Sequence, residues 1–311
     1  MSAAPASPHG LDPDALLAIR DLELRARVVV EGLWAGLHRS PFSGFSVEFS
    51  EYRQYVPGDD LRYLDWRVLA RTDREYLRKF EDETNLRCEL LVDHSRSMTF
   101  GSRRHTKADY ARTLAASLGY FLLQQRDMVG LALFGDGLMA HLAARWRPGH
   151  LRRLLAALDA SPAGTTTNLG GALEDAARLW RKRGLVIIIS DLLEPVENWD
   201  DALGHLVAMG HDVRVFQILD PAELSLEFGR AAEWEDLESD RHLHVDPAQA
   251  ADGYRRRIDA HVRAVARALG DRGIPLQRVT TDRPLDIVLL EWMHQTSSLR
   301  AAANRRGRGH R

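Results

Sequence analysis

Three polar side chains follow a short apolar run near residue 90. Residues 87–97 read Arg-Cys-Glu-Leu-Leu-Val-Asp-His-Ser-Arg-Ser, so Asp93, Ser95 and Ser97 take alternate positions directly after a predicted buried strand. A carboxylate and two hydroxyls suit a hard cation such as Mg²⁺, which takes one or two carboxylates and keeps several waters. The same spacing occurs in ordinary polar turns, so this segment alone leaves both interpretations open.

Two later segments carry the same kind of oxygen donors. Asp191 follows Leu-Val-Ile-Ile-Ile-Ser at 185–190, the clearest buried parallel strand in the sequence, and the polar loop 161–168 with its threonines precedes a predicted helix. Parallel strands with right-handed crossovers bind ligands beyond their carboxyl ends. We therefore expect the two carboxylates and three hydroxyls to converge and to hold one octahedral cation with an open coordination position.

The elements that must position these residues alternate along the chain. This alternation predicts an α/β fold with a doubly wound, mostly parallel sheet and helices on both faces. The predicted strands span 87–93, 128–134, 138–142, 185–191, 212–219 and 275–280. The predicted helices span 106–126, 148–159, 169–182, 198–209 and 248–270, with a last one from about residue 284. The acidic segment 220–246 is interpreted as a solvated loop, with a docking patch as the alternative.

Composition divides the chain further and limits its function. We expect a helical lead-in over 1–36, a small irregular or β-rich module over 37–85, the α/β domain over 86–298 and a basic disordered tail over 299–311. With 311 residues, of which 45% are hydrophobic, the chain can bury a real core. Its 42 basic and 44 acidic residues give a net charge of −2, which provides no overall field for nucleic acid or an anionic membrane.

The use of cysteine and the lack of a targeting or membrane segment indicate a cellular compartment. The single cysteine, Cys88, forms no internal disulfide and is predicted to be a buried strand residue, which favours a reducing environment. Neither a leader-like N-terminus nor an apolar run of about 18 residues is visible. We therefore expect a cytoplasmic protein without a membrane span.

The strand-end residues resemble those of the von Willebrand factor type A (VWA) fold and its metal-ion-dependent adhesion site. Asp93, Ser95 and Ser97 match its Asp-x-Ser-x-Ser element, Thr167 matches its threonine, with Thr166 as the alternative, and Asp191 matches its later aspartate. The resemblance implies that the serines and the threonine ligate Mg²⁺, or else Mn²⁺ or Ca²⁺. It also implies that the aspartates act directly or through water and that a partner's carboxylate completes the shell.

A second resemblance covers most of the chain from about residue 30. The matching segments resemble the signature of the bacterial domain of unknown function 58 family, and they lie at Gly44, 48–53, 57–62, 64–66, 70–72 and 79–83. Membership implies an adaptor that works with a MoxR-type AAA+ ATPase in assembling or activating other proteins. Many members carry membrane helices before the signature, and this chain shows none, so a soluble form is implied.

These observations lead us to expect a non-enzymatic, metal-dependent protein-binding adaptor. Its partners would be a MoxR-like ATPase and a client protein that supplies an acidic side chain. The alternatives are a Mg²⁺-dependent phosphohydrolase and a passive scaffold with an unused metal site. The hydrolase is disfavoured because position 95 makes the motif Asp-x-Ser rather than Asp-x-Asp, and because no lysine follows the 185–190 strand closely. No phosphate-binding Gly-rich loop is present, so any ATPase activity must belong to a partner.

Overall fold

The structure is a computed structural model of the chain, and it describes residues 10–39, 52–54, 76–78, 86–160, 166–225, 232–235, 242–245 and 247–295. The chain divides into two compact units, Met1–Gly36 with Leu86–Arg311, and Leu37–Asn85. In the smaller unit β1 (Tyr52–Gln54) pairs antiparallel with β2 (Tyr76–Arg78). The rest of the family-signature segments and the predicted basic tail lie outside the described residues.

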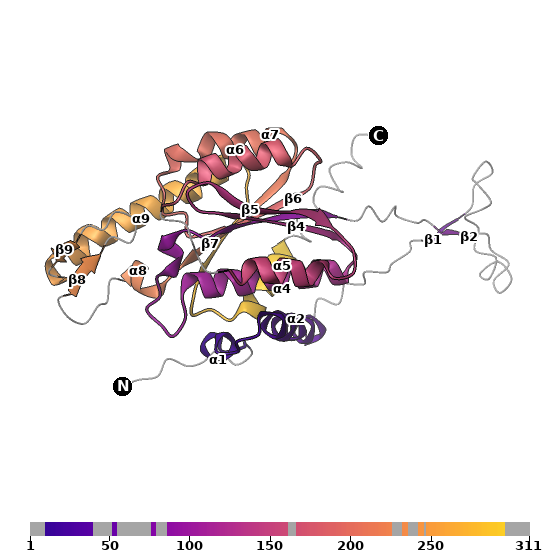
Figure 1. The fold of residues 1–311 in the computed structure, drawn as a ribbon, viewed down its shortest axis with the longest axis horizontal. Helices are drawn as coiled ribbons and strands as arrows, with labels where there is room; N and C mark the ends of the chain where they lie inside the picture. The colour runs from indigo at the N-terminus through magenta and orange to yellow at the C-terminus, as the bar shows by residue number, and fades with distance from the viewer. Residues whose placement is uncertain are drawn as a thin grey trace. The chain divides into compact units, whose positions relative to one another are not determined.

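A six-stranded sheet organises the larger unit (Figure 1). Its strand order is β10-β7-β6-β3-β4-β5, and only β5 runs antiparallel to its neighbour. The strands are β3 (Arg87–Asp93), β4 (Met128–Phe134), β5 (Leu138–Arg145), β6 (Leu185–Ser190), β7 (Asp212–Leu219) and β10 (Leu276–Thr280). Numbered by their order along the chain, they follow the doubly wound order 3-2-1-4-5-6. The predicted α/β fold class, with a doubly wound and mostly parallel sheet, is confirmed.

The two central strands are buried because both of their faces are covered by helices. Every residue of β6 is buried, as are six of the seven residues of β3, including Cys88. Helices on both faces leave no solvated side on which a strand could alternate polar and apolar residues. The apolar run of β6 ends in Ser190, and Asp191 follows it directly. Both residues therefore lie at the carboxyl edge of the sheet.

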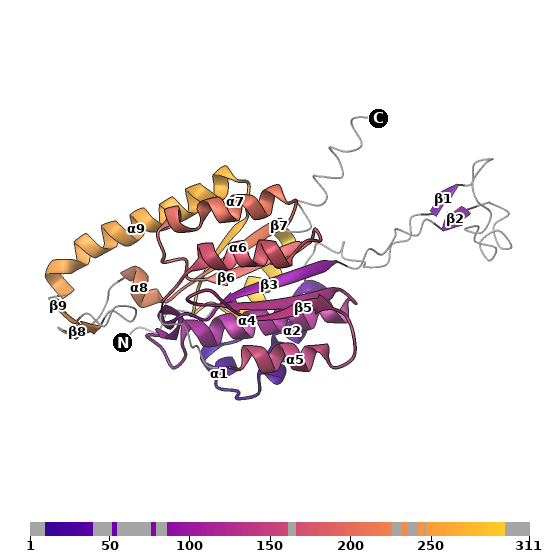
Figure 2. The ribbon, with the colours of Figure 1, turned by 45° about the horizontal axis from the view of Figure 1, so that its top comes forward.

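One face of the sheet is covered by α4 (Lys107–Gln124) and α5 (His150–Leu158), with α1 (Pro13–Leu17), α2 (Leu22–Arg39) and a helix over 285–295 outside or beside them (Figures 1 and 2). The N-terminal helices are part of this layer. The Arg25 guanidinium of α2 donates to Thr113 Oγ1 of α4 at 3.0 Å, and the rings of Trp34 and Phe121 lie 5.7 Å apart.

The other face carries α6 (Leu169–Leu179), α7 (Asp200–Ala208) and α9 (Pro247–Asp271), which Figure 2 shows together above the strands. Buried side chains of all three helices form one apolar cluster with β6 and β7, including Leu173, Leu206, Val265, Ile188 and Val215. Two helical layers around a mostly parallel sheet leave the carboxyl ends of the strands as the place where polar side chains gather.

The acidic segment 220–246 is more ordered than predicted. It contains α8 (Pro221–Ser225) and an antiparallel pair, β8 (Ala232–Glu235) with β9 (His242–Val245). The loop interpretation is therefore wrong for these residues. The sequence Ala-Glu-Trp-Glu alternates apolar and acidic residues with the period of a strand, a signal that the high charge of the segment concealed.

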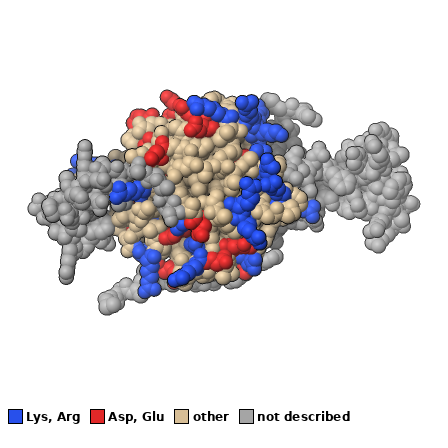
Figure 3. All heavy atoms as spheres, viewed as in Figure 1, with Lys and Arg blue, Asp and Glu red and all other residues tan. Residues whose placement is uncertain are grey.

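Among the described residues, no helix is both long and apolar enough to cross a bilayer. The face drawn in Figure 3 has an uncharged middle bordered by side chains of both signs.

Candidate metal centre

The Asp93 carboxylate lies between the ends of the two central strands. One of its oxygens, Oδ1, accepts the backbone N–H of Ser95 at 2.9 Å, and Oδ2 accepts the hydroxyl of Ser190 at 2.6 Å. Ser190 ends β6, the direct neighbour of β3, so the parallel pairing brings the two together. Asp93 is 1% exposed and Ser95 is fully buried. The predicted strand-end carboxylate is thus rigidly oriented.

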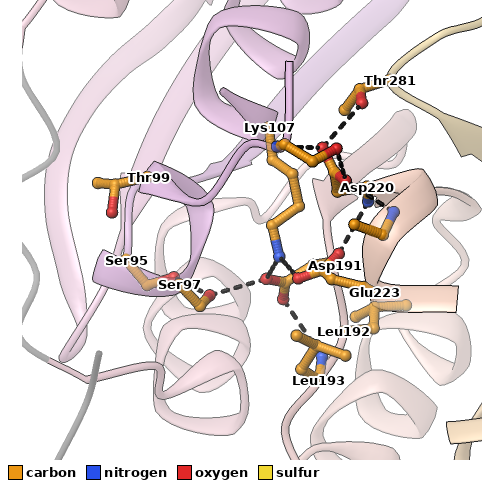
Figure 4. A network of polar contacts seen from close by, with 12 residues as sticks. Ser95, Ser97, Thr99, Lys107, Asp191, Leu192, Leu193, Asp220, Glu223 and Thr281 are labelled. Atoms are coloured by element: carbon orange, nitrogen blue, oxygen red, sulfur yellow. Dashed lines mark hydrogen bonds and ion pairs between the residues drawn. The ribbon is translucent and has the colours of Figure 1, made fainter. Parts of the chain in front are cut away.

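A short 3₁₀ turn returns the chain toward Ser95 and brings in the second hydroxyl. This turn, η2 (Arg96–Thr99), places Ser97 Oγ 3.1 Å from Ser95 Oγ, and Ser97 Oγ also donates to Asp191 Oδ2 at 2.8 Å (Figure 4). Thr99, in the same turn, is exposed and donates instead to the carbonyl of Arg96 at 2.7 Å. Four of the five predicted site residues are therefore linked through short polar contacts at one sheet edge.

The threonine loop is tied to the turn between β4 and β5. Thr166 is exposed, and both its backbone N–H and its hydroxyl donate to Asp136 Oδ1, at 2.6 and 3.0 Å. The Asn168 N–H donates to the carbonyl of Gly135 at 2.8 Å. The Thr166 hydroxyl is thus engaged away from the serines, whereas Thr167 is partly buried. Residues 161–165 of this loop lie outside the described residues.

A lysine that the sequence interpretation missed lies at the centre of the site. The Lys107 ammonium donates to Asp191 Oδ2 at 2.8 Å and to Glu223 Oε1 of α8 at 2.5 Å, and its side chain is completely buried (Figure 4). Thr106 and Asp109 form a capping box that starts α4 at Lys107. The available signal was its position on the buried stripe with Ala111 and Leu114, where a charge needs a partner.

A second carboxylate holds the surrounding segments together. Asp220 accepts the backbone N–H and the hydroxyl of Ser102, at 3.0 and 2.5 Å, and the hydroxyl of Thr281 at 3.3 Å. Burial raises the pKa of this carboxyl, but these hydrogen bonds outweigh burial and leave the pKa below its ordinary value. Asp220 therefore ties the loop before α4 to the end of β10.

Burial and neighbouring charges shift the pKa values of the ionisable side chains in the site. Burial, together with the neighbouring Asp191 charge, raises the pKa of Asp93 to about 7. Burial lowers the pKa of Lys107, but Asp191 and Glu223 outweigh it and hold this pKa above its ordinary value. Burial likewise raises the pKa of Glu223, an effect that the Lys107 ammonium partly offsets. Additional positive charge at this edge would favour the ionised form of Asp93.

The donor set fits a hard cation of the Mg²⁺ type. Ligands at adjacent corners of a Mg²⁺ octahedron lie about 2.9 Å apart, close to the 3.1 Å between the two serine hydroxyl oxygens. Each oxygen of Asp93 and Asp191 already accepts a hydrogen bond from the chain, through Ser95, Ser190, Leu193 and Ser97. Within the described ranges no three His, Cys, Asp or Glu side chains gather as a metal-binding group, so hydroxyls would have to contribute.

Comparison with known proteins gives a family and a fold. The profile described as "Protein of unknown function DUF58" matches residues 51–267. Uncharacterized proteins of Mycobacterium bovis and Mycobacterium tuberculosis are 33% identical over 277 residues, which cover 88% of this chain and 86% of each relative.

Solved structures resemble the chain more distantly. The conserved hypothetical protein BatB from Bacteroides thetaiotaomicron has a TM-score of 0.45 and 14% identity, covering 68% of this chain and 99% of BatB. The SpRpn10 VWA domain has a TM-score of 0.39 and 13% identity, covering 66% of this chain and 93% of that domain. These likenesses carry no argument about what the chain binds.

Proposed function

We propose that this chain, which belongs to the DUF58 family, is a protein-binding module that uses one divalent cation to hold an acidic side chain of its partner. Ser95, Ser97 and Thr167 would ligate Mg²⁺ directly, and Asp93 and Asp191 would act through water. The bound ion would supply a coordination position that a Glu or Asp of the partner completes.

One observation supports this proposal. The hydroxyl oxygens of Ser95 and Ser97 lie 3.1 Å apart, and the Ser97 hydroxyl donates a hydrogen bond to Asp191. Because the Ser97 proton points to Asp191, the lone pairs of Ser97 Oγ are available to a cation. Since every carboxylate oxygen of both aspartates already accepts a hydrogen bond from the chain, a role through water requires no rearrangement of the site. Thr167, the residue that matches the resembled motif, is preferred over Thr166 because Thr167 is partly buried whereas Thr166 is exposed.

The partner proposed here combines chemistry with family resemblance. A divalent cation favours the ionised form of a carboxylate, so it rewards an acidic partner side chain at the site. The resemblance to the family adds a MoxR-type AAA+ ATPase as the expected protein, working with an acidic client. The chain itself would then contribute binding rather than chemical turnover.

Capture of partners from native lysate tests both parts of the proposal. Tagged protein is incubated with Mg²⁺ or with EDTA, and retained proteins are identified by mass spectrometry. We expect an AAA+ ATPase with Mg²⁺ only, loss of it with Ser97→Ala, and unchanged recovery with Thr99→Ala, a neighbouring exposed hydroxyl outside the centre. Recovery in EDTA as well would refute the metal bridge, and no ATPase in either buffer would refute the partner.

A phosphohydrolase is the second candidate, since the structure supplies the lysine whose absence had argued against it. Lys107 reaches Asp191 from another element, as a cation does in many phosphoryl-transfer sites. The burial of Asp93, at 1% exposure, disfavours a nucleophilic role because a substrate phosphorus atom has no access to it. Mg²⁺-dependent release of phosphate from a panel of phosphomonoesters, lost in Asp93→Asn but kept in Thr99→Ala, would reverse this preference.

A further inference from the structure

The Lys107 ammonium is buried between two carboxylates that belong to different parts of the fold. Asp191 follows β6, Glu223 lies on α8, and both accept a hydrogen bond from the same nitrogen, at 2.8 and 2.5 Å. The lysine side chain is 0% exposed, and the carboxylates are 1% and 11% exposed at the side chain. A charge this deeply buried is stable only because it is paired, so the pair is an obligatory part of the folded state.

The two carboxylate oxygens would suit a divalent cation equally well. Mg²⁺ is usually held by one or two carboxylates and completes its shell with water, and Asp191 with Glu223 offers such a pair. The ammonium fills the point where both oxygens converge. It also occupies Asp191 Oδ2, the atom that faces Ser97 and the proposed metal position.

The Lys107 ammonium pairs with Asp191 and Glu223. The positive charge that these two buried carboxylates need is therefore already supplied from within the chain. Asp220, the other carboxylate nearby, is bonded to Ser102 and Thr281 and does not contact Lys107 in any hydrogen bond of the network in Figure 4.

We propose that Lys107 is a resident cation that takes the place of a second divalent ion between Asp191 and Glu223. It thereby limits the centre to one metal and keeps Asp191 from ligating that metal directly. The expectation that the unmodified chain binds one ion rests on the proposed function. The role of Lys107 itself rests only on the contacts of its ammonium.

Counting bound Mn²⁺ by electron paramagnetic resonance, with calorimetric titration of Mg²⁺, tests this role. We expect one ion per chain for the unmodified protein and two for Lys107→Ala, which removes the ammonium from between Asp191 and Glu223. The double variant Lys107→Ala with Glu223→Gln lacks one carboxylate of the new site and should return to one. Glu223→Gln alone, with the ammonium in place, should also bind one.

Folding offers a second readout that does not depend on the partner. Breaking a buried ion pair should lower the melting temperature of Lys107→Ala in EDTA by roughly 10 °C. Mn²⁺ should recover most of that loss, and Na⁺ at equal ionic strength should not. If Lys107→Ala does not fold in EDTA, recovery of its circular dichroism by Mn²⁺ supports the proposal, and failure of Mn²⁺ to restore it overturns the proposal.

The outcomes separate this inference from the proposed function. If the unmodified chain binds no Mn²⁺ while Lys107→Ala binds one, the resident-cation role stands and the metal-dependent function fails. If both bind one ion with equal affinity, the role of Lys107 is overturned and the function stands. If neither binds any ion, both proposals fail.

Discussion

Glu89 is a carboxylate in the middle of the sheet, and its replacement by glutamine should stabilise the protein at alkaline pH. It lies on β3 at 1% exposure, and its Oε1 accepts from the Arg87 guanidinium at 3.2 Å. Burial raises its pKa from 4.5 to about 7, an effect that Arg87 and a hydrogen bond from the Ala144 backbone N–H only partly oppose. The charged form is therefore disfavoured in the folded state.

The size and the sign of the effect on the free energy of unfolding follow from this pKa. A folded pKa of about 7 against an unfolded value of 4.5 corresponds to about 3 kcal/mol lost once the group is ionised in both states. Between these two values the folded state binds a proton that the unfolded state has released, so stability falls as pH rises through that window. Glutamine resembles the neutral acid in shape and does not ionise.

Calorimetric or urea unfolding at two pH values measures the effect. At about pH 5 Glu89→Gln should melt close to the unmodified protein, and at about pH 8 it should melt roughly 6–12 °C higher. Glu174→Gln is the matched control, because Glu174 lies on α6 with its side chain 63% exposed. An equal difference between Glu89→Gln and the unmodified protein at both pH values would refute the assignment of a buried ionised carboxylate.

Further outcomes are expected elsewhere in the chain. Gly130→Ala should cost about 1–3 kcal/mol in urea unfolding, since a Cβ there would overlap the Glu89 carboxylate; a loss below that range would mean that Glu89 can move aside. Thr106→Ala removes the capping box of α4 and should cost about 1 kcal/mol by the same assay, against Thr99→Ala as control. Arg126→Gly should raise stability by about 0.5–1 kcal/mol, because Arg126 has a φ of 64° just after α4; a decrease would contradict this. Mg²⁺ at a hundred times its Kd should raise the melting temperature by roughly 5–10 °C, reversibly with EDTA, and no shift would count against the centre.

Local patterns were sufficient for the fold. Apolar runs of strand length alternating with helical periodicity predicted every strand of the main sheet, and the all-apolar run at 185–190 marked a strand covered on both faces. The hairpin at 232–245 was missed because charge dominated the interpretation of a segment with strand alternation. Cys88, predicted to be a buried strand residue, is one.

The sequence by itself determined that the polar residues at the strand ends meet, and only the tertiary structure decided which other residues join them and how all of them are bonded. Asp93, Ser95, Ser97 and Asp191 had to approach one another, because residues that follow neighbouring parallel strands share one sheet edge. The partnership of Lys107 with Asp191 and Glu223 spans 84 and 116 residues of sequence, so the position of Lys107 on the apolar stripe of α4 showed that it needs a partner but not which one. Short-range periodicity encodes elements and their ends, whereas the pairing of long charged side chains depends on distances that exist only in the folded state.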